Sequence, residues 1–152
     1  MAETIGRVRL VRPAAIAVAV GAFVVLAAVA AIRVSAATPK SCPSASVVSA
    51  ALGTKASTAK LTKNPYGITC QYGTNALATK VEFQQDTAAT FAAGEKAAGA
   101  ALPVVKIAHL GRAAWAPKSG GSIYVFTGSY QIKILAVLTS LPKLETLARK
   151  LL

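Results

Sequence analysis

Hydrophobic residues are distributed along this chain in two ways, as one unbroken run near the N-terminus and as periodic patterns after it. The run, residues 14–32, holds 19 consecutive residues of Ala, Val, Ile, Leu, Phe and a single Gly. As a helix it would be about 28 Å long, close to the roughly 30 Å of hydrocarbon in a bilayer. Three arginines precede the run and one follows it, namely Arg7, Arg9, Arg12 and Arg33. Because the more cationic flank stays in the cytoplasm, the run predicts that the rest of the chain lies outside.

A cleaved secretory signal fits the same segment, because the small residues Val34-Ser35-Ala36, followed by Ala37, offer a cleavage site. The run is longer than an ordinary signal core, which favours a retained single-pass anchor in the cell membrane. Its nine alanines lower its hydropathy, which favours cleavage after Ala36 and secretion. Both alternatives stay open, and both divide the chain in the same way. Residues 1–37 are a basic tip with the signal anchor or signal peptide, residues 38–41 are a linker, and residues 42–152 are one extracytoplasmic domain.

The first half of this domain predicts a helix followed by a hairpin. Ser44 is a suitable N-cap, apolar residues recur after it at helical spacing up to Leu52, and Gly53 ends the helix. Apolar and polar residues then alternate, as in half-buried strands, on both sides of a turn at Gly73-Thr74-Asn75. The inward-facing residues are Ile68, Cys70, Tyr72, Val81 and Phe83.

The second half predicts two helices and four strands. Asp86 or Thr87 caps an alanine-rich helix that runs to about Gly99 and carries a single Phe91. Ser140 caps a final helix whose apolar stripe consists of Leu144, Leu147, Ala148 and Leu151. Strands are predicted at 104–107, 113–115, 122–127 and 130–138, with a tight turn at Gly128-Ser129 between the last two.

This order of elements predicts the fold class. Helices and strands are grouped rather than strictly alternating, which is typical of an α+β domain and not of a doubly wound parallel sheet. We therefore expect a single, mainly antiparallel sheet with helices packed on one face.

The two cysteines of the chain, Cys42 and Cys70, both lie in the part that is expected outside the cell, where thiols are oxidised. We predict that they form a disulfide, which would stabilise the domain by about 3 to 4 kcal/mol by closing its loop. A metal site would need more ligands than two cysteines and the single His109. No metal and no other cofactor is expected.

The exported part of the chain is strongly basic. Of the 17 Lys and Arg residues in the chain, 13 lie after residue 37, against Glu82, Asp86, Glu95 and Glu145. This excess favours binding to an anionic lipid or an envelope polymer, although a merely solvated basic surface explains it as well. The residues expected to bind anions are Lys55, Lys60, Lys63, Lys143, Arg149 and Lys150. Nucleic acid is not favoured, because the aromatic residues fall at core positions rather than among the basic ones.

The strand at 122–127 is apolar on both faces, which leaves two alternatives for the sheet. Either both faces are covered, or one face forms an apolar pocket for a lipid or a partner protein. In the second case the pocket is lined by Tyr124, Phe126, Leu135 and Val137. Trp115 is expected at the core rather than in a ligand platform.

Enzymatic chemistry is disfavoured by a shortage of suitable residues. The exported part offers one histidine, one aspartate and three glutamates for any general acid, base or metal ligand. His109 has no nucleophile beside it in any recognisable motif, and no phosphate-binding glycine loop is present. We expect a binding protein and not an enzyme.

Five short motifs make the domain resemble a known group of proteins. They are Cys42 ahead of a helix ending in Leu52-Gly53, Cys70-Gln71-Tyr72, the stretch from Leu110 to Trp115, the hairpin of 122–138, and the final Leu147-Ala148-Arg149 helix. With these motifs, residues 42–152 resemble exported actinobacterial envelope proteins and lipoproteins, which are related in outline to the extracellular sensor domains of some serine/threonine kinases. The resemblance implies a one-disulfide α+β domain of binding or sensor type, without catalytic residues. The chain departs from the lipoprotein members because Pro39-Lys40-Ser41 does not form a lipidation box.

Overall fold

A computed structural model of the chain describes residues 37–74 and 76–152. The predicted membrane segment at 14–32 and the residues preceding the predicted cleavage site lie outside the described residues. Within the described ranges, no helix is long and apolar enough to cross a membrane. The elements are α1 (Ala45–Leu52), β1 (Lys60–Asn64), β2 (Gly67–Tyr72), β3 (Thr79–Gln85), α2 (Ala88–Ala101), β4 (Val104–Lys106), β5 (Ala113–Pro117), β6 (Ser122–Phe126), β7 (Tyr130–Leu135) and α3 (Leu141–Leu151).

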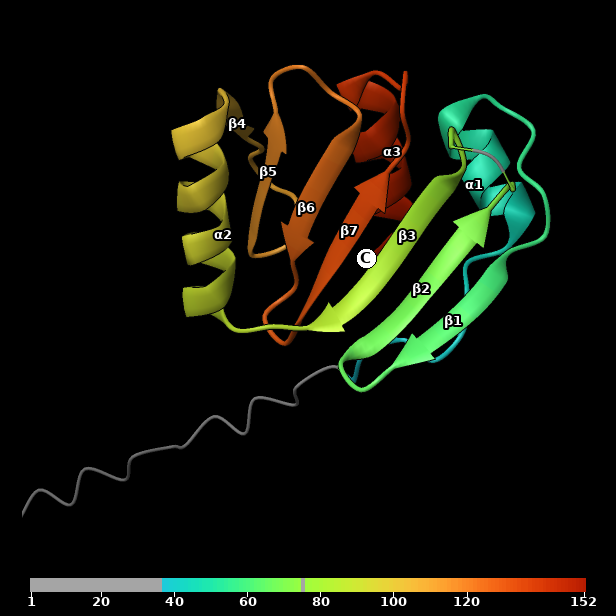
Figure 1. Cartoon of the computed structure of the whole chain (residues 1–152), viewed down its shortest axis with the longest axis horizontal. Helices are drawn as coiled ribbons and strands as arrows, with labels where there is room; N and C mark the ends of the chain where they lie inside the picture. Colours follow the sequence, from blue (N-terminus) through green and yellow to red (C-terminus); the bar gives the residue numbers. More distant parts are fainter. Residues whose placement is uncertain (1–36, 75) are drawn as a thin grey trace, which may run out of the picture. The chain divides into compact units, whose positions relative to one another are not determined.

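All seven strands belong to one open antiparallel sheet with the order β1-β2-β3-β7-β6-β5-β4 (Figure 1). Two meanders make up this sheet, β1 to β3 and β4 to β7, and they join where β3 pairs with β7. The α+β class and the antiparallel sheet that the sequence predicts are therefore confirmed.

One face of the sheet, which we call the core face, packs against α1 and α3. Its inward side chains come from every second strand position, and several of them are completely buried, such as Val81, Ile123 and Ile134. The helices contribute Val48 and Leu52 from α1 and Leu144, Leu147 and Ala148 from α3. In Figure 1 both helices lie behind the sheet. This face holds the main hydrophobic core of the domain.

The third helix, α2, lies on the opposite face, which we call the open face. Its single buried residue, Phe91, packs against Trp115 and Phe126, whose neighbours in β5 and β6 point to the core face. The expectation that the helices share one face is therefore wrong. The physical reason is that an alanine-rich helix has little hydrophobic surface of its own, so a small aromatic cluster at one edge of the open face is sufficient to hold it.

Local sequence signals explain where α1 and the first hairpin begin and end. The Ser44 hydroxyl accepts a hydrogen bond from the Val47 N–H, and Gly53 ends α1 with a left-handed φ of 68°. Gly67, at the start of β2, passes so close to β3 that a Cβ would collide with the Phe83 carbonyl oxygen. Glycine is therefore required for β2 to pair with β3 at this point.

Three differences from the predicted elements concern exposed segments. The stretch Lys60–Asn64 forms the edge strand β1, although all five of its residues are exposed and show no apolar alternation. Conversely, the strand predicted at 130–138 is shorter than expected. β7 ends at Leu135, so Val137 and Leu138 lie in a turn. α2 is capped by Thr87, one of the two expected residues, and it continues to Ala101.

A disulfide joins Cys42 and Cys70, as the sequence predicts. The Cα atoms are 5.6 Å apart, which lies within the usual range for a disulfide. Cys70 is fully buried on the core face, and Cys42 packs against the same core from the segment before α1. The bond therefore links the start of the domain to an inner strand of the sheet.

Candidate functional site

The uncovered part of the open face is polar, and the strand register shows which side chains are neighbours. Glu82 of β3 pairs with Lys133 of β7, and Lys133 pairs with Tyr124 of β6. In the next row, Gln84 pairs with Gln131. All these residues point to the open face because their sequence neighbours are in the core.

These side chains form the floor of a hollow beside α2, which we call the open-face groove. Its volume is about 500 Å³. Such a size falls within the range of small-molecule sites. Strands β3, β6 and β7 form the floor of this groove, α2 forms one wall, and β5 closes one end. The lining residues are Glu82, Gln84, Gln85, Asp86, Thr90, Gly94, Ala98, Trp115, Tyr124, Gln131 and Lys133.

An ion pair crosses the floor of this groove. Lys133 Nζ lies 3.5 Å from Glu82 Oε2, and both side chains are largely shielded from solvent. The same ammonium group lies 5.8 Å from the centroid of the Tyr124 ring. Lys133 is thus placed between a carboxylate and an aromatic face. With Asp86 at the rim, acidic groups outnumber basic ones in the groove.

Aromatic rings close the end of the groove that α2 covers. Tyr124 stacks on Trp115 with ring centroids 4.0 Å apart, and Phe91 of α2 contacts the other residues of the cluster, Trp115 and Phe126. Trp115 Nε1 is buried without a hydrogen-bond partner in the described part of the chain. An unsatisfied buried donor costs about 1 to 3 kcal/mol, so this indole N–H stands out beside the groove.

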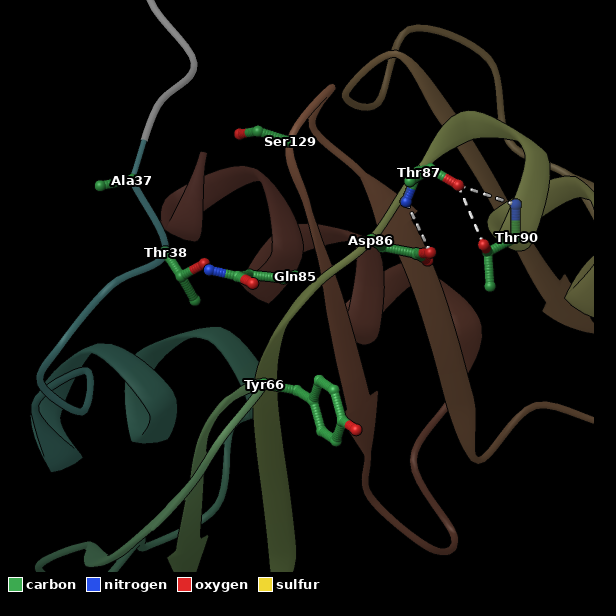
Figure 2. A pocket seen from close by; sticks show the side chains of 8 residues that line it. All are labelled: Ala37, Thr38, Tyr66, Gln85, Asp86, Thr87, Thr90 and Ser129. Carbon is green, nitrogen blue, oxygen red and sulfur yellow. Dashed lines mark hydrogen bonds between the residues drawn. The ribbon is translucent and has the colours of Figure 1, made fainter.

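A second hollow lies at the end of the sheet where the linker enters the domain (Figure 2). Ala37 and the linker residue Thr38 line it together with Tyr66, Gln85 and Ser129, and its volume is about 550 Å³. Thr38 and Gln85 point toward one another in Figure 2. An adjoining hollow of about 420 Å³ extends along the β1–β2 turn and includes Lys40 and Lys63. The linker therefore runs along this turn.

The four residues expected to line an apolar pocket lie in different surroundings. Phe126 is buried under Phe91, and Tyr124 is half-buried at the aromatic end of the open-face groove. Leu135 is half-buried next to Ser122, whereas Val137 is half-exposed in the turn after β7. Gln84 and Gln131, which form the polar floor of the groove, were not identified from the sequence. The only sign of them in the sequence is their outward position in alternating strands.

The six residues expected to bind anions are spread over the domain. Lys60 and Lys63 lie on opposite faces of β1, because three positions separate them along a strand. Lys143 reaches the C-terminal end of α1 beside Gly53. Arg149 donates to the His109 carbonyl oxygen at 2.9 Å and lies 3.9 Å from Glu145, while Lys55 and Lys150 are exposed. They do not share one surface.

Within the described residues, no group of three or more His, Cys, Asp or Glu side chains is arranged to hold a metal ion. Burial raises the pKa of Tyr72 to about 12. Its hydroxyl donates to the Pro43 carbonyl oxygen at 2.6 Å on the core face. This tyrosine is a structural residue close to the disulfide and lies outside the open-face groove.

Comparisons with known proteins add no relative to this description. The chain matches no family model, no curated protein and no solved structure. The function must therefore be argued from the geometry of the domain.

Proposed function

We propose that this chain is a non-enzymatic binding protein of the bacterial envelope, anchored in the membrane or secreted, that binds a neutral polyhydroxylated ligand in the open-face groove. The observation that carries the proposal is the combination of a polar floor with an aromatic end in one hollow of about 500 Å³. The resemblance to exported binding and sensor domains agrees with this proposal.

The chemistry of the floor suits a carbohydrate. The paired amides of Gln84 and Gln131 each offer donors and an acceptor, and a sugar hydroxyl both donates and accepts. Tyr124 closes the aromatic end of this floor, with Trp115 stacked on its ring and the Lys133 ammonium group 5.8 Å from the ring centroid. Anionic ligands are disfavoured here because Glu82 and Asp86 outnumber Lys133.

The surroundings of the ionisable groups support a binding rather than a catalytic role. Glu82 is paired with Lys133 in an ion pair. The Asp86 carboxylate accepts a hydrogen bond from the Thr87 N–H at the start of α2. His109 is exposed in a turn, and its carbonyl oxygen is used by Arg149.

The test is a titration of the full chain in phospholipid nanodiscs, because sugar-based detergents would compete for the site. The probes are neutral oligosaccharides of glucose, galactose, mannose, arabinose and N-acetylglucosamine. Their binding is measured by calorimetry and by the fluorescence of Trp115. We expect saturable binding of at least one probe. The Gln84→Ala/Gln131→Ala variant should then bind at least about tenfold more weakly, because two hydrogen-bonding side chains are removed.

The matched control is Thr62→Ala, which removes a polar side chain from the same face of the sheet but outside the groove. It should bind as the wild type does. If no probe binds saturably, or if the double variant binds as tightly as the control, the proposed function is wrong. Equal unfolding temperatures of the two variants show that any loss of binding is local.

A further inference from the structure

We propose that the β1–β2 turn docks onto the headgroups of an anionic membrane through Lys40, Lys63 and Tyr66. This surface lies at one end of the sheet and does not include the open-face groove. It gives the domain a fixed orientation on the membrane, independently of what the groove binds.

The path of the linker is the first argument. Residues 37–40 line the same hollow as Lys63, Pro65 and Tyr66, so the chain enters the domain along the β1–β2 turn. Figure 2 shows Ala37 and Thr38 next to the end of β3, with Tyr66 in the same view. Any tether that precedes residue 37 therefore holds the domain by this end.

The length of that tether is the second argument. The sequence predicts a membrane span that ends at Ile32, five residue steps before Ala37. A fully extended chain covers at most about 3.4 Å per residue, so Ala37 cannot be more than about 17 Å from the end of the span. The headgroup region occupies several ångströms of this distance. The β1–β2 turn consequently stays within reach of the headgroups whenever the anchor is retained.

The side chains at this end are the third argument. Tyr66 is 70% exposed on the turn, and Lys40 and Lys63 are exposed beside it. Tyrosine is enriched where a protein meets the bilayer interface, and lysines near the surface are attracted to anionic lipids. β1 is an edge strand that pairs only with β2, so its outer side is accessible to a membrane surface. Charge complementarity thus selects an anionic bilayer as the partner.

The experiment uses the full chain reconstituted into vesicles that contain brominated phosphatidylcholine, with or without phosphatidylglycerol. Bromine quenches only a tryptophan that is close to the lipid, so the Tyr66→Trp variant reports on docking. The matched control is Val137→Trp, which places a tryptophan at a half-exposed position in the turn that follows β7. Trp115 is buried and contributes the same background to both variants.

Quenching should be at least about twofold stronger in Tyr66→Trp than in Val137→Trp. We expect this difference only in vesicles that contain phosphatidylglycerol and only at low salt. In the Tyr66→Trp background, Lys40→Glu/Lys63→Glu should weaken docking about fivefold for each lysine lost. Lys118→Glu/Lys150→Glu, which changes the net charge equally at other exposed positions, should leave the quenching unchanged. Equal quenching at both reporter positions, or equal effects of the two charge changes, would overturn the proposal.

Discussion

The two faces of the sheet are built by the same strands but from different chemistry. On the core face, alternate residues of every inner strand are apolar and buried beneath α1 and α3. On the open face, the positions in between carry Glu82, Gln84, Gln131 and Lys133, and only the β4 to β6 edge is covered, by α2. Strand alternation alone therefore separates the side chains that build the hydrophobic core from those that line the open-face groove. Open-face substitutions can therefore alter the groove while leaving the core intact.

The largest difference between the faces should appear when leucine is truncated on each of them. Leu147 of α3 is completely buried on the core face, so Leu147→Ala should lower the free energy of unfolding by about 2 to 5 kcal/mol. Leu135 of β7 is half-buried on the open face, and Leu135→Ala should cost about 1 kcal/mol or less. Urea unfolding of both variants measures this contrast. Equal losses would show that the open face supports the fold as much as the core face does.

A smaller effect is expected when the aromatic cluster of the open face is removed. Phe91→Ala leaves a gap that opens at the edge of the sheet, so it should cost about 2 kcal/mol, less than truncation of a fully enclosed phenylalanine. Hydrogen exchange should increase mainly in α2, because Phe91 is the buried residue of that helix. The matched core-face variant, Phe83→Ala, should raise exchange throughout the sheet. A rise throughout the sheet in Phe91→Ala would contradict the separation of the faces.

A loss of similar size, which depends on pH, is expected for a buried hydroxyl group on the core face. Burial raises the pKa of Tyr72 to about 12, above the value of 10.0 for an unperturbed tyrosine. The unfolded chain therefore loses this proton first, so the stability that Tyr72 contributes is complete below pH 10 and is lost as the pH rises toward 12. The loss should be roughly 1 to 3 kcal/mol. Lysines also titrate in this range, so the measurement is the difference between the wild type and Tyr72→Phe in urea unfolding at pH 9 and pH 11.5. If the free energy of unfolding depends on pH in the same way in both proteins, the loss of stability is not due to Tyr72.

Much of the fold could be predicted from the sequence, because apolar residues recur at regular intervals wherever one side of a helix or strand is buried. α1 has both of its caps in the sequence, the α3 stripe is regular, and β2, β3 and β7 alternate. The disulfide followed from the number of cysteines and their expected compartment. The helices and strands among these features are local, so each can be predicted from its own segment.

The remaining features depend on partners that lie outside the segment itself. β1 is a strand because it pairs with β2, although its own five residues are all exposed. The position of α2 depends on how Phe91 meets Trp115 and Phe126, which an alanine-rich helix does not reveal. The groove was missed for the same reason. Alternation shows that Glu82 and Lys133 face outward, but only the register of β3 and β7 makes them neighbours.

The position of the disulfide has a consequence for how the domain would carry mechanical load. Cys42 is the first residue of the domain after the linker, and its partner Cys70 lies in β2, an inner strand. A pulling force applied through the N-terminal tether passes directly from residue 42 to β2. The loop between the two cysteines, which contains α1 and the edge strand β1, is bypassed and cannot be peeled off first. The edge strand β1 is thus excluded from the path of tension, which enters the sheet at the inner strand β2.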